Sequence, residues 1–290
     1  MIYVVIGTTF LTYMFNAYAL SKLTASTVSS FVYLQPIVGI IYAITTDNDS
    51  LTFLSVAGMI LIFLGVYLVT KKIEKNVWIF ITFIGVRNYL IEFLGTLFLV
   101  LIIGLSNNPV AIGFGLTVLV YMGAHMSGAH YNPVVTIAFL IKKEINLYDA
   151  FFYIFFQILG STFSALILFF LKGDVMEITP NLSSSVFQIL ASEFLFTFLL
   201  VFVILNVAIH PNLKGNSFYG FAIGLTVMAG AFSVGPISGA VFNPAVSIGP
   251  TLSHFILGEG ISKYYLWYYL VGPIVGSLLA TFSFIYFVKR

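Results

Sequence analysis

Apolar stretches long enough to cross a bilayer recur along the whole chain, and this feature constrains the fold more than any other. The runs 51–69, 90–105, 150–171 and 186–209 approach or exceed the roughly 18 to 20 residues that span about 30 Å of hydrocarbon. Charged residues make up only 8% of the 290, against roughly 25% in an ordinary soluble domain. We therefore expect an all-α integral membrane protein embedded in the lipid bilayer.

Turn signals and charges divide the sequence into candidate spans. These are 2–20, 24–45, 51–70, 78–105, 109–124, 148–171, 186–209, 217–235 and 264–288. The basic stretch 71–75 is the one place where the chain changes character. We accordingly predict a first part at 1–72, a linker with the start of the next helix at 73–87, and a second part at 88–290.

The Lys and Arg residues are distributed unevenly between the two sides of the membrane. If Lys71 and Lys72 face the cytoplasm, successive crossings leave only Lys172 and Lys263 outside. The residues that share the inner side are Lys22, Lys75, Arg87, Lys142, Lys143, Lys214, Lys289 and Arg290. This asymmetry predicts a multi-pass protein of the plasma membrane with a cytoplasmic C-terminus.

Composition also argues against several other functions. The net charge of +2 is too small and too dispersed to indicate a nucleic-acid partner. The chain has no cysteine, and no metal-ligand cluster or nucleophile with a base is visible in the sequence. We therefore expect no metal, no cofactor and no enzymatic activity.

The second part of the chain contains an internal repeat. The motif EFLGT at 92–96 is echoed by EFLFT at 193–197, and SGAHYNPVV at 127–135 is echoed by SGAVFNPAV at 238–246. Each half then holds three spans and one short apolar segment. Because three is an odd number, the second half must be inverted relative to the first, as in many membrane transport proteins.

The short apolar segments at 134–141 and 245–257 each follow an Asn-Pro dipeptide. Asn is a favoured N-cap, and Pro is favoured as the first helical residue. About ten helical residues reach only halfway across a bilayer. The sequence therefore predicts two half-helices that begin near the midplane, at Asn132-Pro133-Val134 and Asn243-Pro244-Ala245.

The approach to each half-helix, at 123–131 and 235–242, is rich in glycine and non-helical in our prediction. Such backbone is tolerated at membrane depth only where it faces protein or a water-filled cavity. Capping occupies the side-chain oxygens of Asn132 and Asn243, which leaves both amide NH2 groups to donate into the lumen. A water held as an acceptor by both amides cannot relay a proton, and the positive helix ends oppose cations.

These features resemble the aquaporin, or major intrinsic protein, family, over about residues 86–290. The paired boxes, the Ser-Gly-Ala leaders and the run AIGLTV at 222–227 carry the resemblance. It implies an inverted repeat of six transmembrane helices plus two half-helices, here preceded by three extra helices. It also implies a homotetramer with one pore in each subunit.

The chain departs from the family pattern at the narrow filter of the pore. Val246 stands where the family usually has an arginine, and Ser247 stands where glycerol facilitators have an aspartate. The resemblance assigns the filter to Ala231, Ala240, Val246 and either Ile112 or Phe114. Ungapped counting favours Ile112, whereas matching the FGLT run favours Phe114, so both assignments stay open.

Four ionisable residues lie near the two boxes. Glu92 and Glu193 fall within spans, and we favour a structural role in which each carboxylate accepts backbone N–H groups of a loop. His125 and His130 are candidates for gating by titration, but we favour a role as hydrogen-bonding supports of the loop.

The first part of the chain resembles a different family. The motif ALSKLTAS at 19–26, YLQP at 33–36 and the segment 58–69 are similar to the last three spans of an EamA-type drug/metabolite transporter. Three spans lack the rest of a transport cavity, so we predict no transport activity for this part alone.

The predicted function is a passive channel for water and other small neutral solutes that excludes ions and protons. One alternative is a facilitator for glycerol, ammonia or another small uncharged solute, which Val246 favours. The other is an ion-coupled secondary transporter, since broken helices in inverted repeats occur there too. That alternative needs cation-binding groups at the midplane, where the sequence offers only the two glutamates.

Overall fold

The computed structural model describes residues 18–19, 22, 78–258 and 260–288. The chain divides into two compact units, Met1–Ile79 and Phe80–Arg290. Apart from the three residues near position 20, the three predicted spans before residue 72 and the basic stretch 71–75 lie outside the described residues. The second unit contains helices and no strand in its described part, as the all-α prediction requires.

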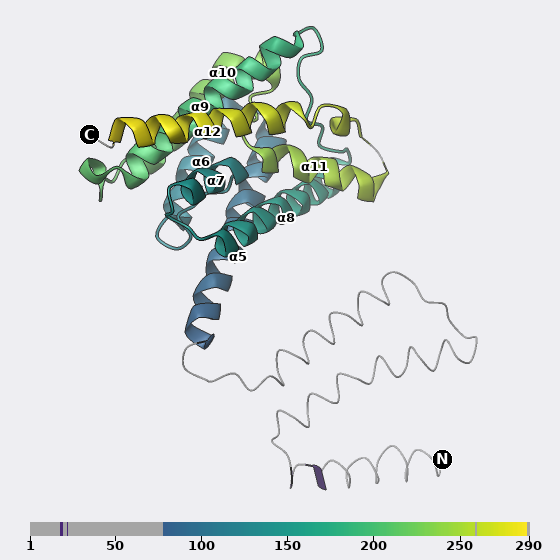
Figure 1. The fold of residues 1–290 in the computed structure, drawn as a ribbon. Coiled ribbons are helices and arrows are strands. Elements are labelled where there is room, and N and C mark those ends of the chain that lie inside the picture. Colours follow the sequence, from purple (N-terminus) through teal and green to yellow (C-terminus); the bar gives the residue numbers. More distant parts are fainter. Residues whose placement is uncertain (1–17, 20–21, 23–77, 259, 289–290) are drawn as a thin grey trace, which may run out of the picture. The chain divides into compact units, whose positions relative to one another are not determined.

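Eight α-helices and two short 3-10 helices make up the described part of the second unit (Figure 1). They are α5 Trp78–Ser106, α6 Pro109–Gly123, α7 Pro133–Ile141, α8 Leu147–Lys172, α9 Val186–Ile209, η2 Pro211–Leu213, α10 Tyr219–Ser238, α11 Pro244–Leu257, η3 Ser262–Tyr264 and α12 Tyr268–Val288. The predicted spans match the long helices to within four residues.

One predicted boundary needs a correction. The helix α10 does not end at residue 235 but continues through Pro236 to Ser238, so 235–238 is helical rather than an extended approach to the box. Pro236 has no N–H to donate to the carbonyl of Phe232, which weakens this last turn, and the helix ends only where Gly239 adopts a left-handed φ of 86°. The N–H of Gly239 then donates to the carbonyl of Gly235 at 3.0 Å.

The two predicted half-helices are present as α7, with 9 residues, and α11, with 14 residues. Asn132 is the N-cap of α7, and its side-chain oxygen accepts from the N–H of Val134 at 3.1 Å. Asn243 caps α11 in the same way, through the N–H of Ala245 at 2.9 Å. Each cap satisfies one of the N–H groups that a helix start leaves unpaired.

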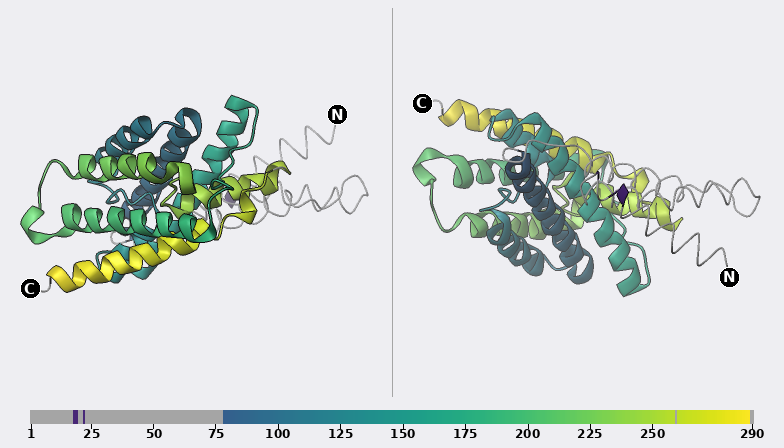
Figure 2. Two further views of the ribbon diagram at one scale, coloured as in Figure 1. Left: turned by 90° about the horizontal axis from the view of Figure 1, so that it is seen from above. Right: turned by 90° about the horizontal axis from the view of Figure 1, so that it is seen from below.

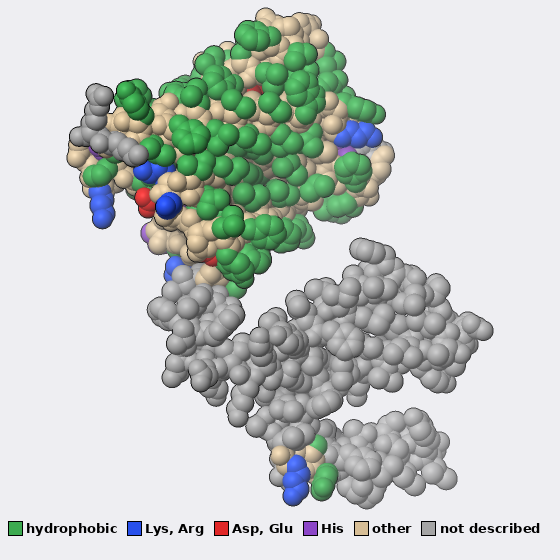
Figure 3. Space-filling model, in the orientation of Figure 1, with side chains coloured by type: hydrophobic (Ala, Val, Ile, Leu, Met, Phe, Trp, Pro, Cys, Tyr) green, Lys and Arg blue, Asp and Glu red, His purple; other side chains and the backbone are tan. Residues whose placement is uncertain are grey.

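The outer surface of this unit is suited to lipid. Five described helices are long and apolar enough to cross a membrane, whereas α6 has only 15 residues, or about 22 Å of helix. Hydrophobic side chains cover most of the visible face, while Lys and Arg lie toward its two ends (Figure 3). Large apolar side chains such as Phe163, Leu195 and Phe282 are exposed on the helices that span.

Small residues allow the helices to approach closely. Seen from above, α9 lies between α10 and α12 (Figure 2), and it packs against both. A Cβ added at Gly276 of α12 would lie 2.4 Å from the carbonyl oxygen of Phe194 in α9. A Cβ added at Gly160 of α8 would lie 2.3 Å from the carbonyl oxygen of Phe93 in α5. The two halves of the repeat therefore use the same kind of helix crossing.

Gly160→Ala is expected to lower the melting temperature of the purified protein by several degrees, because α8 must move away from α5 to admit the methyl group. Overpacking of this kind costs about 1–3 kcal/mol. Gly235→Ala is the matched control, since a Cβ there meets nothing within 4 Å. The melting temperatures are measured by fluorescence-detected size-exclusion chromatography after heating. Equal values for the two variants would contradict the close approach of α8 to α5 at Gly160.

Candidate functional site

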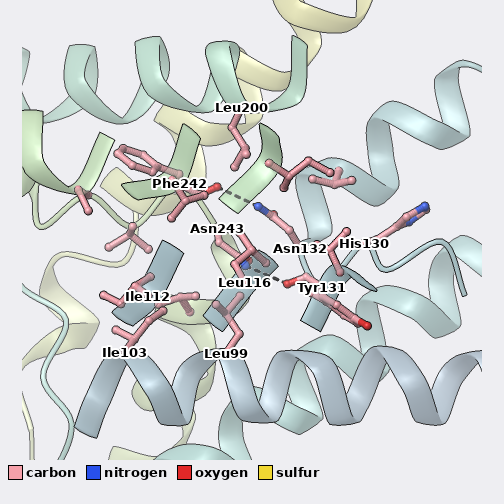
Figure 4. A pocket seen from close by; sticks show the side chains of 18 of the residues that line it. Leu99, Ile103, Ile112, Leu116, His130, Tyr131, Asn132, Leu200, Phe242 and Asn243 are labelled. Atoms are coloured by element: carbon pink, nitrogen blue, oxygen red, sulfur yellow. Dashed lines mark hydrogen bonds between the residues drawn. The ribbon is translucent and has the colours of Figure 1, made fainter. Parts of the chain in front are cut away.

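A cavity of about 990 Å³ lies within the second unit and is lined by residues from both halves of the repeat. Both box asparagines line it, together with both loops that precede the half-helices. Apolar side chains from α5, α6 and α9 also line the cavity near the asparagines (Figure 4). They include Leu99, Ile103, Ile112, Leu116 and Leu200.

The two box asparagines both line this cavity, and each directs its amide toward the loop of the other half of the repeat (Figure 4). The amide Nδ2 of Asn132 donates to the carbonyl oxygen of Phe242 at 2.9 Å, and Nδ2 of Asn243 donates to the carbonyl oxygen of Tyr131 at 2.9 Å. Each asparagine therefore joins the loop of the other half of the repeat. Both side chains are buried, with 5% of their surface exposed.

This geometry corrects one detail of the sequence-based prediction. Both N–H groups of each amide were expected to donate into the lumen, but one of the two holds the opposite loop. The reason is that a buried backbone carbonyl needs a donor, and the amide is within reach. An amide carries two N–H groups, so one remains on each asparagine for a molecule in the cavity.

The carboxylate of Glu92 holds the first loop in place. Its Oε1 accepts from the hydroxyl of Ser127 at 2.6 Å and from the N–H of His130 at 3.0 Å. Its Oε2 accepts from the N–H of Tyr131 at 2.7 Å and from the side-chain amide of Gln157 at 2.8 Å. This is the structural role that we favoured for the residue.

Glu193 does the same for the second loop. Its Oε1 accepts from the hydroxyl of Ser238 at 2.7 Å and from the N–H of Val241 at 3.0 Å. Its Oε2 accepts from the N–H of Phe242 at 2.8 Å. Both glutamates are fully buried. They differ in the number of donors, because Pro273 occupies the position in α12 that corresponds to Gln157 in α8.

The direction of these N–H groups fixes the direction of the loop carbonyls. In a trans peptide the N–H and C=O groups point in opposite directions. Since the N–H groups of His130 and Tyr131 point to Glu92, the carbonyls of Ala129 and His130 point away from it, on the side where these residues line the cavity. The same argument applies to the carbonyls of Ala240 and Val241.

The loops achieve this with residues in the left-handed region. Ala129 and Tyr131 have φ values of 52° and 51°, and both Ala240 and Phe242 have 52°. Such values are uncommon outside glycine, and they persist where surrounding bonds enforce them. The cavity centre therefore offers two amide donors, flanked on each side by a row of carbonyl acceptors.

A buried tyrosine supports each loop from the long helix that follows it. The hydroxyl of Tyr153 donates to the carbonyl of Ser127 at 2.8 Å, and that of Tyr269 donates to the carbonyl of Ser238 at 2.7 Å. Sequence reasoning missed this pair. The echo of YIFFQILGS at 153–161 in YLVGPIVGS at 269–277 is the signal that could have revealed it.

Comparison with known proteins agrees with this arrangement. Residues 55–286 match the family described as major intrinsic protein. The chain belongs to that family. The match begins before residue 86, where the sequence analysis put the start of the resemblance. Residues 1–71 match the EamA-like transporter family, which confirms the second resemblance.

Several relatives are plant members of this family. The chain is 38% identical over 181 residues to Aquaporin NIP3-1 of Arabidopsis thaliana, covering 59% of this chain and 54% of that protein. It is 40% identical over 170 residues to Nodulin-26 of Glycine max, covering 57% and 59% of the two chains. The chain thus spans little more than half the length of these relatives.

A solved structure shares the fold. The X-ray structure of the aquaglyceroporin from Plasmodium falciparum superposes with a TM-score of 0.62 at 24% identity. The superposition covers 69% of this chain and 95% of that one. It confirms the predicted aquaporin-like fold of the second unit.

In this major intrinsic protein, the two residues that the sequence left open for the fourth filter position lie on different sides of α6. Ile112 lines the cavity, as do Ala231, Ala240 and Val246. Phe114 does not line it, and 48% of its surface is exposed on the outside of α6. We therefore propose Ile112, rather than Phe114, as the fourth filter position, because Phe114 lies on the side of α6 that faces away from the cavity.

The two histidines of the first loop occupy different environments. His130 is buried, its Nδ1 lies 3.1 Å from the hydroxyl of Thr136, and its ring packs against Phe139 and Tyr153. These contacts fit a supporting role for His130. His125 is exposed and lines the cavity.

Sequence reasoning also missed a loop between α8 and α9 that contributes to the cavity. Residues Asp174, Val175, Met176, Glu177, Ile178 and Thr179 all line it. No periodicity or repeat marks this segment, so the sequence offered no signal for it.

Proposed function

We propose that the chain is a passive transmembrane channel for water and other small neutral solutes that excludes ions and protons. The observation that carries this proposal is the pair of asparagine amides that line one cavity, each at the start of a half-helix. Membership of the major intrinsic protein family supports a channel rather than an enzyme.

Exclusion of protons follows from the directions of the hydrogen bonds. A water at the centre accepts one N–H from Asn132 and one from Asn243, so both its lone pairs are occupied. Its own protons then point outward, to the carbonyls of the two loops. Proton hopping needs every water in a single file to donate its hydrogen bond in the same direction. The central water donates toward both ends of the file, so the direction reverses there and a proton cannot pass.

Exclusion of ions follows from the lining. Among the described residues of the cavity wall, the charged side chains are those of Lys172, Asp174 and Glu177, and none of them belongs to a box loop or a half-helix. An ion at the centre would lose its hydration with no opposite charge to replace it. The positive ends of α7 and α11 add a barrier to cations.

Ion-coupled transport is disfavoured by the same contacts. The sequence offers Glu92 and Glu193 as the ionisable groups near the midplane, and both carboxylates are occupied by loop donors. Binding of a coupling ion would require these bonds to break. Each break would release the loop that carries the carbonyls.

Small uncharged solutes besides water are favoured by the filter positions. Ile112, Ala231, Ala240 and Val246 contribute only apolar side chains to the wall. An arginine at 246 would add five N–H donors and fill space. Without it, a facilitator for glycerol or ammonia is the second candidate function.

Reconstituted vesicles separate these functions. The full chain is purified, incorporated into liposomes and exposed in parallel to water, glycerol and ammonia gradients, with shrinkage and internal pH followed by stopped flow. We expect fast water flux with no dependence on an ion gradient. Saturable uptake driven by a sodium or proton gradient would overturn the channel and favour the transporter.

Val246→Arg is expected to reduce glycerol flux more than water flux, by about tenfold against about twofold, because the guanidinium fills space that only the larger solute needs. A tenfold difference corresponds to about 1.4 kcal/mol in barrier height. The measurement is the ratio of the two permeabilities in the same vesicles. Equal loss of both fluxes would count against position 246 as part of the filter.

The same proposal includes the placement of the protein. We place it in the plasma membrane with a cytoplasmic C-terminus, following the Lys and Arg asymmetry, and as a homotetramer, following the family. The channel comprises residues 88–290 after a linker at 73–87. The EamA-like segment at 1–72 is assigned no transport of its own.

A further inference from the structure

The loop between α8 and α9 forms part of the cavity wall, next to a filter position. Ile178 is buried in one apolar cluster with Val246, Val100 and Tyr269. Met176 packs against the same cluster and also lines the cavity. Where the family usually has a charged filter residue, this chain therefore has a valine that belongs to the same buried apolar cluster as an isoleucine from a different segment.

A set of hydrogen bonds ties this loop to η3. The N–H of Ile178 donates to the hydroxyl of Ser262 at 2.8 Å, and that hydroxyl donates to Glu177 Oε2 at 2.8 Å. Glu177 also accepts from the N–H of Ile261 at 3.0 Å. The backbone that leads into Ile178 is thus held by a single buried serine and its carboxylate partner.

Two further residues, His254 and Asn181, hold the loop before and after the bonds to Ser262. The Nε2 of His254, in α11, lies 3.0 Å from the carbonyl oxygen of Met176. Downstream, the N–H and the Nδ2 of Asn181 donate to the carbonyls of Ile237 and Pro236, at the end of α10, at 3.1 and 2.9 Å. The loop is therefore anchored to α10, which precedes the second box, to α11, which begins at that box, and to η3.

We propose that Ile178 is a further solute-selecting residue of the pore, and that Ser262 with Glu177 is the positioning pair that sets how far its side chain narrows the passage at Val246. This inference rests on the proposed channel function and adds a residue from outside the four filter positions. The solutes selected against are neutral molecules larger than water, since the cluster contributes only apolar surface.

The test compares permeability ratios in vesicles containing the full chain. Ile178→Ala is expected to raise the ratio of glycerol to water permeability by threefold or more, with water permeability changed less than twofold. Ile178→Phe is expected to lower the ratio. Leu182→Ala is the matched control, because Leu182 is an aliphatic residue of the same loop that is 72% exposed and does not line the cavity.

Ser262→Ala tests the positioning pair. It should shift the ratio in the same direction as Ile178→Ala, although Ser262 itself does not line the cavity. The shift should disappear when Ser262→Ala is introduced into the Ile178→Ala background, because coupled residues are non-additive. A merely structural role would reduce all fluxes together and leave the ratio unchanged.

Unchanged ratios in both Ile178 variants would overturn the inference while leaving the channel intact. Additive effects of Ser262→Ala and Ile178→Ala would overturn the positioning role alone. Absence of water flux in the wild-type vesicles would instead defeat the proposed function, so the two failures are distinguishable.

Discussion

Asn132→Ser is expected to lower the water permeability of each channel by about tenfold without preventing the protein from folding. Serine is as good an N-cap as asparagine, so the start of α7 keeps its acceptor. Serine has no amide, however, so the variant loses both the donor to Phe242 O and the donor to the central water. The loss of about one hydrogen bond in the barrier, near 1.4 kcal/mol, corresponds to the tenfold effect.

The measurement is stopped-flow shrinkage of vesicles, normalised to the amount of reconstituted protein. Asn243→Ser should give a similar loss, because its amide holds the carbonyl of Tyr131 in the same way. Asn108→Ser is the control, since Asn108 also caps a helix that begins with Pro-Val but does not line the cavity. Wild-type permeability in both box variants would refute the role of the amides.

Asn108 also shows what the sequence can and cannot tell about an Asn-Pro dipeptide. Asn108-Pro109-Val110 and Asn132-Pro133-Val134 are the same tripeptide, and both begin a helix. Local chemistry therefore predicts the caps correctly at all of these positions. Only the repeat, in which the box at 132 has a partner at 243, distinguishes the pore element from an ordinary helix start.

The glutamate contacts were predictable for the same reason. EFLGT and EFLFT lie at corresponding places in the two halves, and a buried carboxylate must find donors. The exposed backbone of a re-entrant loop supplies such donors. By contrast, the bonds from the asparagine amides to the opposite loop join residues 110 and 112 positions apart. No local pattern encodes which half of the repeat a given amide will touch.

The choice between Ile112 and Phe114 depended on helix rotation. Two residues turn an α-helix by about 200°, so one candidate faces the cavity while the other faces away. The sequence of α6 could be aligned with the family pattern in two ways, which differ by two residues. Which side of α6 faces the cavity depends on how α6 packs against α10. The loop with Ile178 is irregular, and its position depends on long-range bonds from Ile178 to Ser262 and from Asn181 to Pro236.

The largest effect on stability is expected from Glu92→Ala. The carboxylate accepts from four donors, two of them backbone N–H groups of the first loop. Alanine leaves all four without this partner in a buried site, and each unsatisfied donor costs about 1–3 kcal/mol. The sum is comparable to the whole free energy of unfolding of a typical domain, about 5–15 kcal/mol. We therefore expect little or no monodisperse protein.

Glu193→Ala should be less severe, because that carboxylate has three donors and no counterpart of Gln157. Glu144→Ala, at an exposed position, controls for the loss of a carboxylate as such. Yield and melting temperature by fluorescence-detected size-exclusion chromatography should fall in the order Glu144→Ala, Glu193→Ala, Glu92→Ala. The reverse order of the two buried variants would show that donor count does not set the stability of the loops.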